Sequence, residues 1–230
     1  MKLIESYVVG KLELIAQQRS KIIVRIVDCG NAVRVYGDKE LEQEHSFGQV
    51  YGDFHKNEIT LSHPLTVFKE GDKVKLSRIP GEHDENDKFS LENLTLSKSH
   101  ACTLEEAFST EGAPTVQGKE LFSIEIHGVL ERLQKGNGKV AFRLKSNEKT
   151  YVFFDNDTNQ TNKTQVFDKT VYAEIPMEKL LYDVTLLSIS YKEGDKVSLS
   201  GMVNEDFYNL DNTTLAIGYG NPNYKSRWDL

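Results

Sequence analysis

The 230-residue sequence lacks the features that mark several large classes of protein. Its only cysteines, Cys29 and Cys102, form no CxxC pair or Cys/His cluster, so the sequence predicts neither a disulfide framework nor a zinc site. No stretch approaches the roughly 20 apolar residues of a membrane-spanning helix. Charged residues interrupt positions 1–14, so no signal peptide is expected. These absences favour a reducing compartment, and we expect a cytoplasmic location.

The chain also lacks the short motifs of the common enzyme classes. It has no Walker loop, no GxGxxG, no GxSxG elbow and no HExxH, and its six histidines show no pairing at helical spacing. Carboxylates cluster at 82–87, in a polar run that is typical of a solvated turn. We therefore expect a protein that is not an enzyme, with no cofactor and no metal.

Positive charge is scarce. The sequence has 28 Lys and Arg against 35 Asp and Glu, which gives a formal net charge of −7. This balance disfavours a protein that coats duplex DNA through a broad basic surface. A narrow basic groove on an acidic body is still compatible with it, so the positions of the cations decide more than their sum.

What the sequence does contain is an internal repeat. The letters KEGDKV occur at 69–74 and again at 192–197, an offset of 123 residues. An offset of 118 aligns Gly10 with Gly128 and Arg25 with Arg143, and this register holds without a gap from residue 10 to residue 36. Farther on, SLENLTLS (90–97) matches NLDNTTLA at an offset of 119. The conserved order predicts two copies of one domain.

Both copies have the pattern of β structure. Apolar and polar residues alternate along 5–17, 21–27 and 32–37, and along 121–133, 139–145 and 150–154, with turns between these runs. Helical periodicity is nearly absent; the best helix candidate begins at Thr103, where Glu106 completes a capping box. We predict domain 1 at 1–98, a linker with a short helix at 99–119, domain 2 at 120–219 and a C-terminal tail at 220–230.

The second copy reads G-V-L at 128–130, G-K-V-A-F-R-L-K at 138–145, Y-V-F-F at 151–154 and K-E-G-D-K-V-S-L-S-G at 192–201. This order resembles the OB-fold pattern of nucleic-acid-binding domains such as those of replication protein A. In that pattern a glycine interrupts strand one, a charged residue lies on strand two, and GDxVxxxG opens strand four. The first copy departs from it through a long aromatic-rich insert at 38–68. The resemblance implies an all-β protein of two tandem five-stranded OB-like β-barrels.

An OB barrel binds a single strand on the outer face of strands two and three, with aromatics for stacking and cations for phosphate. In both copies the apolar side of strand two is expected inside, and an arginine lies on the other side. One interpretation is an extended nucleic-acid groove; the other is that the charges are solvated and the aromatics close the barrel end. The candidate groove residues are Lys21, Arg25, Arg34, Tyr36, Lys139, Arg143, Lys145 and Phe154.

The first functional hypothesis is non-enzymatic binding of single-stranded DNA or RNA by two weak grooves, joined by a linker that raises their effective concentration. The alternative is a protein–protein interaction module, in an accessory or inhibitory role, that uses barrel rims, inserts and the tail. Tyr224, Arg227 and Trp228 are the candidate partner-binding residues of the tail. A carbohydrate-binding β-sandwich is a third hypothesis. The preference for DNA or RNA and the oligomeric state stay open.

Overall fold

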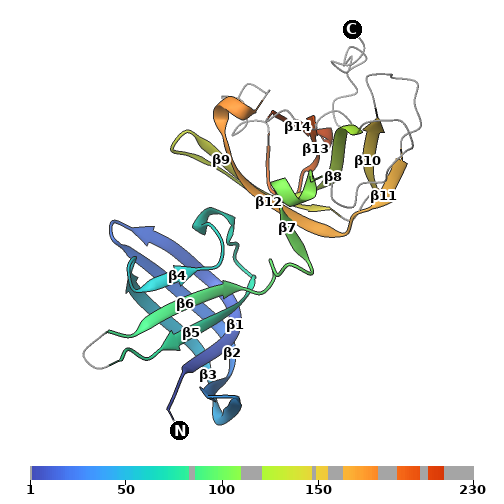
Figure 1. The fold of residues 1–230 in the computed structure, drawn as a ribbon. Helices are drawn as coiled ribbons and strands as arrows, with labels where there is room; N and C mark the ends of the chain where they lie inside the picture. Colours follow the sequence, from blue (N-terminus) through green and yellow to red (C-terminus); the bar gives the residue numbers. More distant parts are fainter. Residues whose placement is uncertain are drawn as a thin grey trace. The chain divides into compact units, whose positions relative to one another are not determined.

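The computed structural model describes residues 2–82, 86–109, 121–146, 149–154, 163–180, 191–202 and 207–214. The chain divides into two compact units, Met1–Ser97 and Lys98–Leu230, each built around one sheet (Figure 1). Helical structure in the described ranges is confined to a one-turn helix and a few short turns. The all-β prediction is therefore confirmed. No helix of the described part is long and apolar enough to span a membrane.

The sheet of unit 1 has the strand order β3-β2-β1-β5-β6-β4, and β4 runs parallel to β6 while the other neighbours are antiparallel. A short 3₁₀ turn, η1 (Leu65–Val67), precedes β5. The strands are β1 (Glu5–Gln18), β2 (Lys21–Tyr36), β3 (Lys39–His55), β4 (Ile59–Leu61), β5 (Lys73–Ile79) and β6 (Lys88–Asn93).

The sheet of unit 2 has the order β11-β10-β8-β9-β12-β7, and β13 pairs with both β8 and β14. The first strand of this unit, β7, lies parallel to β12. A 3₁₀ turn, η2 (Met177–Lys179), follows β12. The strands are β7 (Ala101–Thr103), β8 (Leu121–Gly136), β9 (Lys139–Ser146), β10 (Lys149–Phe154), β11 (Lys163–Val166), β12 (Lys169–Pro176), β13 (Lys196–Met202) and β14 (Tyr208–Asn212).

Part of the predicted linker belongs to the second unit. The helix α1 (Leu104–Ala107) follows directly after β7, and its N-cap is Thr103. The Glu106 amide donates to the Thr103 hydroxyl at 3.1 Å, and the Thr103 amide donates to the Glu106 carboxylate at 2.8 Å. The predicted capping box is thus confirmed. Because β7 pairs with β12, residues 101–107 are a folded part of unit 2.

The repeat is visible in the strand pairing of the two units. Leu12 faces Ile26 in unit 1, and Leu130 faces Leu144 in unit 2, at the constant offset of 118. In both units the register shifts directly after this pair, and the bulge leaves a glutamate, Glu13 or Glu131, as the extra residue. The two units therefore share one plan for their first hairpin, including its irregularity.

The third strand of each unit was assigned incorrectly from the sequence. Residues 32–36 continue β2 instead of forming a new strand, and 149–154 form β10, which pairs with β8. The strand that pairs with the second strand is β3 in unit 1 and β12 in unit 2. These two strands correspond at an offset of 121, where QVYGDF at 49–54 matches TVYAEI at 170–175. The alignment missed them because the second copy has three more residues before this point.

The prediction of two tandem OB barrels is not confirmed. In unit 1 the path of paired strands has two ends, β3 and β4, among the residues that the structure describes. In unit 2 the path likewise ends at β11 and β7 over the described ranges. The parallel pair of Ile59 with Phe89 in unit 1 has a counterpart in the bridge of Leu180 with Tyr208. What the two units share is thus the strand plan, without closed sheets.

The repeated KEGDKV segment is a structural turn in both units. Its glycines, Gly71 and Gly194, have φ of +90° and +93°, the left-handed region that favours glycine. The Asp72 carboxylate accepts hydrogen bonds from the Lys69 amide at 3.0 Å and from the Asn93 side chain at 2.7 Å. In unit 2, Asp195 accepts from Lys192 and Asn212 in the same way. The turn is thereby fixed to the last strand of its unit.

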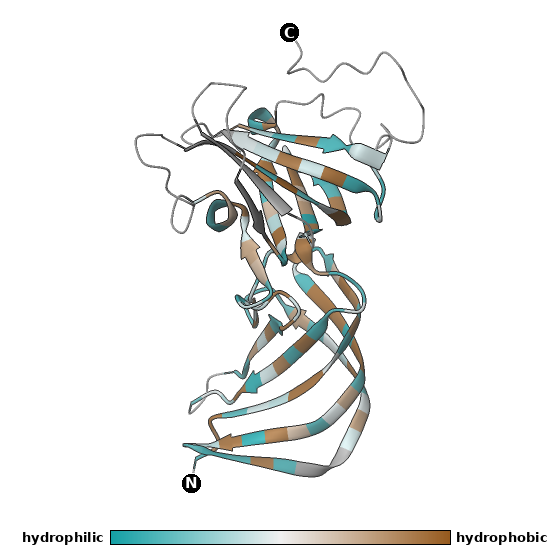
Figure 2. Ribbon diagram, turned by 90° about the vertical axis from the view of Figure 1, so that its right-hand side faces the viewer, coloured by the Kyte–Doolittle hydropathy of each residue, from teal (hydrophilic) through white to brown (hydrophobic). Residues whose placement is uncertain are grey.

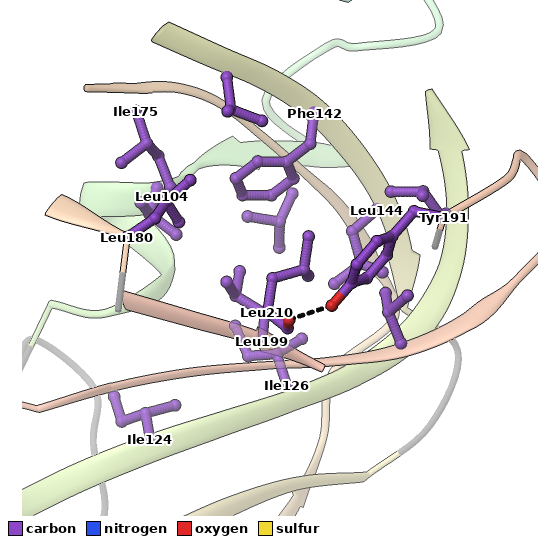
Figure 3. Packing of buried hydrophobic residues seen from close by; sticks show 14 of the residues in the cluster. Leu104, Ile124, Ile126, Phe142, Leu144, Ile175, Leu180, Tyr191, Leu199 and Leu210 are labelled. Carbon is purple, nitrogen blue, oxygen red and sulfur yellow. Dashed lines mark hydrogen bonds between the residues drawn. The ribbon is translucent and has the colours of Figure 1, made fainter. Parts of the chain in front are cut away.

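Each unit has a hydrophobic core formed by the alternating residues of its own strands, which appear as brown and teal bands in Figure 2. The predicted inward residues of β2 and β9 are buried, which confirms this side of the pattern: Ile22, Val24, Ile26, Val140, Phe142 and Leu144. In unit 2, α1 contributes Leu104 beside Ile175 and Leu180, and the Tyr191 hydroxyl donates to the Leu210 carbonyl (Figure 3).

Candidate nucleic-acid interface

The outer face of unit 1 is the side of β1, β2 and β3 that points away from the core. Its central row is formed by Leu14, Arg25 and Tyr51, which are direct neighbours across the three strands. Arg25 lies between the fully buried Val24 and Ile26, so its side chain points to the opposite side of the sheet. The bulge at Glu13 is what places Leu14 on this face.

Tyr51 is the most exposed large apolar side chain of the described residues, with 62% of its surface accessible. The Arg25 side chain beside it is 42% exposed. The neighbouring positions on β2, Ile23 and Val27, are partly buried and form an apolar floor between the charged groups. A free aromatic ring next to a guanidinium is the combination that stacks a base and contacts its phosphate.

Cations gather at one end of this face. Arg19 is in the turn between β1 and β2, and Lys21 begins β2 opposite His55. The Lys56 amide donates to the Ser20 carbonyl at 2.9 Å, so Lys56 lies at the same end of the sheet. The opposite end, at the β2–β3 turn, carries three carboxylates and one cation: Asp38, Glu40, Glu42 and Lys39. The unit is therefore polarised along its strands.

Carboxylates pair with several of the cations on the outer face. Arg25 contacts Glu13, Lys21 lies 3.1 Å from the Asp53 carboxylate, and Lys11 lies 3.0 Å from Asp28. The side chains of these pairs are partly or largely exposed, although the Arg25 Nε atom itself is buried. Pairs that reach solvent in this way contribute only about 0–1 kcal/mol to stability. An incoming phosphate can therefore take the place of the carboxylate at small cost.

Unit 2 repeats this arrangement but buries its centre. Arg143 has Arg132 and Tyr172 as its neighbours across the strands, and its Nε donates to the Glu131 carboxylate at 2.8 Å. Only 3% of the Arg143 side chain is exposed. The expectation of a solvent-facing Arg143 is therefore wrong. Alternation along a strand predicts which side a residue takes, and it does not predict whether that side stays open.

Two predicted groove residues of unit 1 lie on the other side of the sheet. Arg34 pairs with Ser6, which is two positions from Val8, and Val8 packs against the core. Tyr36 is two residues farther along β2 and therefore lies on the same side as Arg34. The reason is that residues 32–36 continue β2, so Arg34 and Tyr36 have the same parity as the inward Ile22, Val24 and Ile26; the two register shifts between Val27 and Val33 cancel and leave that parity unchanged. Arg34 and Tyr36 are thus separated from Arg25.

The remaining candidates fall into three groups. Lys139 is exposed and lies 3.8 Å from Glu174, as the counterpart of the pair between Lys21 and Asp53. Lys145 is exposed at the end of β9. Phe154 pairs with Leu121 in β10, and its side chain lies outside the described part. The tail residues Tyr224, Arg227 and Trp228 also lie outside the described residues.

Tyr51 is the residue that reasoning from the sequence missed. It lies inside the aromatic-rich insert at 38–68. The available signal was the repeated pattern Val-Tyr-x-acid, at 50–53 and 171–174, whose tyrosines both lie opposite the duplicated arginine. An offset of 121 residues, different from the other two, is what aligns Tyr51 with Tyr172.

A second polar cluster lies on β8 and β13 of unit 2. The Glu125 carboxylate accepts from the Ser198 hydroxyl at 2.7 Å and pairs with the His127 ring at 2.9 Å. The hydrogen bond from His127 lowers the pKa of Glu125, with help from Ser198 and against the opposing effect of burial. Ser198 thus bonds to the acid, which is not the order of a nucleophile activated by histidine. Among the described residues no group of three metal-ligating side chains occurs.

Comparisons with known proteins add no family. No known protein family matches the chain, and no curated protein matches it in sequence. A solved structure of the cytoplasmic molybdate-binding protein ModG with molybdate bound is 7% identical and covers 90% of this chain and 94% of its own, with a TM-score of 0.19. A structure described as a molecular basis for abrogation of activation of pro-inflammatory cytokines is also 7% identical, covers 92% and 95%, and has a TM-score of 0.19. At these scores neither likeness bears on fold or function.

Proposed function

We propose that unit 1 binds single-stranded nucleic acid on its outer face. The observation that carries this proposal is the exposed ring of Tyr51 directly across from Arg25, on an open three-stranded surface. Base stacking on an aromatic side chain contributes about 1–3 kcal/mol per base, and it does not depend on sequence. The protein has no catalytic part in this function.

The charges suit a single strand that lies across the basic end of the face. Arg25 and Lys21 would exchange Glu13 and Asp53 for phosphate oxygens, and Arg19 and Lys56 would extend the contact. If about three phosphates are neutralised, the logarithm of the binding constant falls with the logarithm of salt with a slope of about −2. Binding is therefore modest and only moderately sensitive to salt.

One site replaces the two equivalent grooves expected from the repeat. In unit 2 the guanidinium of Arg143 is buried against Glu131, and Tyr172 is half-buried. A phosphate cannot reach that guanidinium without opening the pair, which costs far more than at the exposed Arg25. The nucleic-acid function is accordingly assigned to unit 1 alone. A protein-interaction role would use another part of the same unit, the edge of β3.

The test is a fluorescence-anisotropy titration of the full chain with labelled dT15 and U15 at two salt concentrations. We expect Tyr51→Ala to weaken binding by about tenfold, because one stacked base is lost. Tyr51→Phe keeps the ring and should bind almost as well as the wild type. Phe207→Ala, which removes an exposed aromatic of unit 2, is the matched control and should change nothing.

The proposal fails if the wild-type chain does not bind either oligonucleotide at tens of micromolar protein in low salt. It also fails if Phe207→Ala reduces binding as much as Tyr51→Ala does. A binding constant that is independent of salt would remove the phosphate contacts from the account.

A further inference from the structure

The edge of β3 that faces away from β2 has no strand partner among the residues that the structure describes. The corresponding strand of unit 2 is occupied on this side. There, β7 runs parallel to β12, with Ala101, Cys102 and Thr103 beside Thr170, Val171 and Tyr172. The Thr170 amide donates to the His100 carbonyl at 2.9 Å, which anchors the added segment.

The register shows which residues of β3 correspond to this docking edge. Lys145 faces Thr170 in unit 2, and Val27 faces Gln49 in unit 1. Val27 corresponds to Lys145 at an offset of 118, and Gln49 corresponds to Thr170 at an offset of 121. The Gln49 amide therefore points away from β2, as the Thr170 amide does. Gln49, Val50 and Tyr51 thus offer the backbone groups that Thr170, Val171 and Tyr172 offer to β7.

We propose that the edge of β3 at 49–51 takes up an extended segment of a partner protein as an added parallel strand, in the way that β12 takes up β7. This function is distinct from the nucleic-acid function of the outer face, because it uses backbone hydrogen bonds at the edge. Strand addition of this kind draws its affinity from the main chain and its specificity from alternate side chains.

Side chains near the edge define the chemistry of the partner segment. Cys102, the middle residue of β7, is buried with Val171 in the core of unit 2, so the middle residue of the partner should be small and apolar. The charges near this edge are mixed, because Asp53 pairs with Lys21, and His55 and Lys56 follow at the same end of β3. The partner segment is therefore defined by its small apolar middle residue and its free backbone groups.

The exposed apolar residues of β3 also argue for a partner. Proteins guard a free edge with bulges and charges, and β3 has a bulge with Gly48 at φ +62°. Exposed large apolar side chains do not protect an edge against association. Two of them, Leu41 and Phe47, are nevertheless 58% and 55% exposed on this strand. Phe47, two residues before Gln49, is available to cover the apolar part of a docked segment.

The test uses the full chain and a synthetic peptide, KSHAVTKKK, which copies residues 98–103 with Cys102→Val and adds three lysines for solubility. We expect a dissociation constant below about 1 mM, and protection of the Gln49 amide from hydrogen exchange when the peptide is bound. Gln49→Pro removes the outward amide and should weaken binding by at least about tenfold, whereas Gln49→Ala retains the amide and should bind normally. A peptide with a charged middle residue, KSHADTKKK, should bind at least about tenfold more weakly, because the corresponding Cys102 is buried in unit 2.

Three outcomes would overturn the proposal: no binding of KSHAVTKKK at 1 mM, equal binding by Gln49→Pro and Gln49→Ala, or protection of amides elsewhere with Gln49 unchanged. Tyr51→Ala separates this proposal from the nucleic-acid function, because it removes the ring and keeps the backbone. Peptide binding should survive in Tyr51→Ala, while binding of dT15 should weaken.

Discussion

The two units carry the same arginine, glutamate and tyrosine in the same strand positions, and they differ in exposure. In unit 1, Arg25 and Tyr51 face solvent and the edge of β3 is open in the described part. In unit 2, Arg143 is buried against Glu131, Tyr172 is half-buried, and β7 occupies the edge of β12. In unit 2, where β7 is added beside β12, the row around the arginine is buried; in unit 1 the corresponding row is accessible. The duplicated residues are a property of the strand plan, and the open surroundings decide whether they can bind a ligand.

The largest difference should appear when the duplicated arginines are removed. Arg143→Ala empties a buried site and leaves Glu131, which is 21% exposed, without its partner, and we expect a loss of about 3 kcal/mol in the free energy of unfolding. Arg25→Ala breaks an exposed pair and should cost less than about 1 kcal/mol. Differential scanning calorimetry of the full chain measures both. Equal losses in the two variants would show that the units do not differ in the way described.

A smaller difference is expected at the repeated turn. Asp72 is only 3% exposed and holds both the Lys69 amide and the Asn93 side chain, so Asp72→Ala should destabilise unit 1 by about 2–3 kcal/mol. Asp195 makes the corresponding bonds in a more open place, and Asp195→Ala should cost about 1 kcal/mol. Urea denaturation followed by circular dichroism checks the order. A larger loss in Asp195→Ala would contradict it.

The smallest expected effect is a dependence on pH that belongs to unit 2. Because the folded pKa of Glu125 is below its usual value of about 4.3, its ionised form stabilises the fold above that pH. This contribution is lost as the pH falls through the lowered pKa. Glu125→Gln should therefore flatten the acid side of the stability curve of unit 2, measured by thermal melts between pH 6 and about 3. An unchanged acid limb would assign the loss to other groups.

The sequence predicted the repeat, the inward residues of the second strands, the KEGDKV turn and the capping box at Thr103, because each depends on local pattern or on identical letters. It did not predict the position of Arg34, because the pattern at 32–37 suggests a separate strand, whereas these residues continue β2 and keep the parity of its inward side. It placed Arg143 on the correct side of its strand and missed its burial, which depends on tertiary packing. Tyr51 was missed because insertions moved its block to a third offset.

The central claim is that the accessible row of unit 1 binds nucleic acid and that the matching row of unit 2 does not. The most direct measurement compares Tyr51→Ala with Tyr172→Ala in a titration with labelled dT15, after calorimetry has shown that both variants are folded. The account predicts about tenfold weaker binding for Tyr51→Ala and wild-type binding for Tyr172→Ala. Equal losses in the two variants, or a loss in Tyr172→Ala alone, would contradict it.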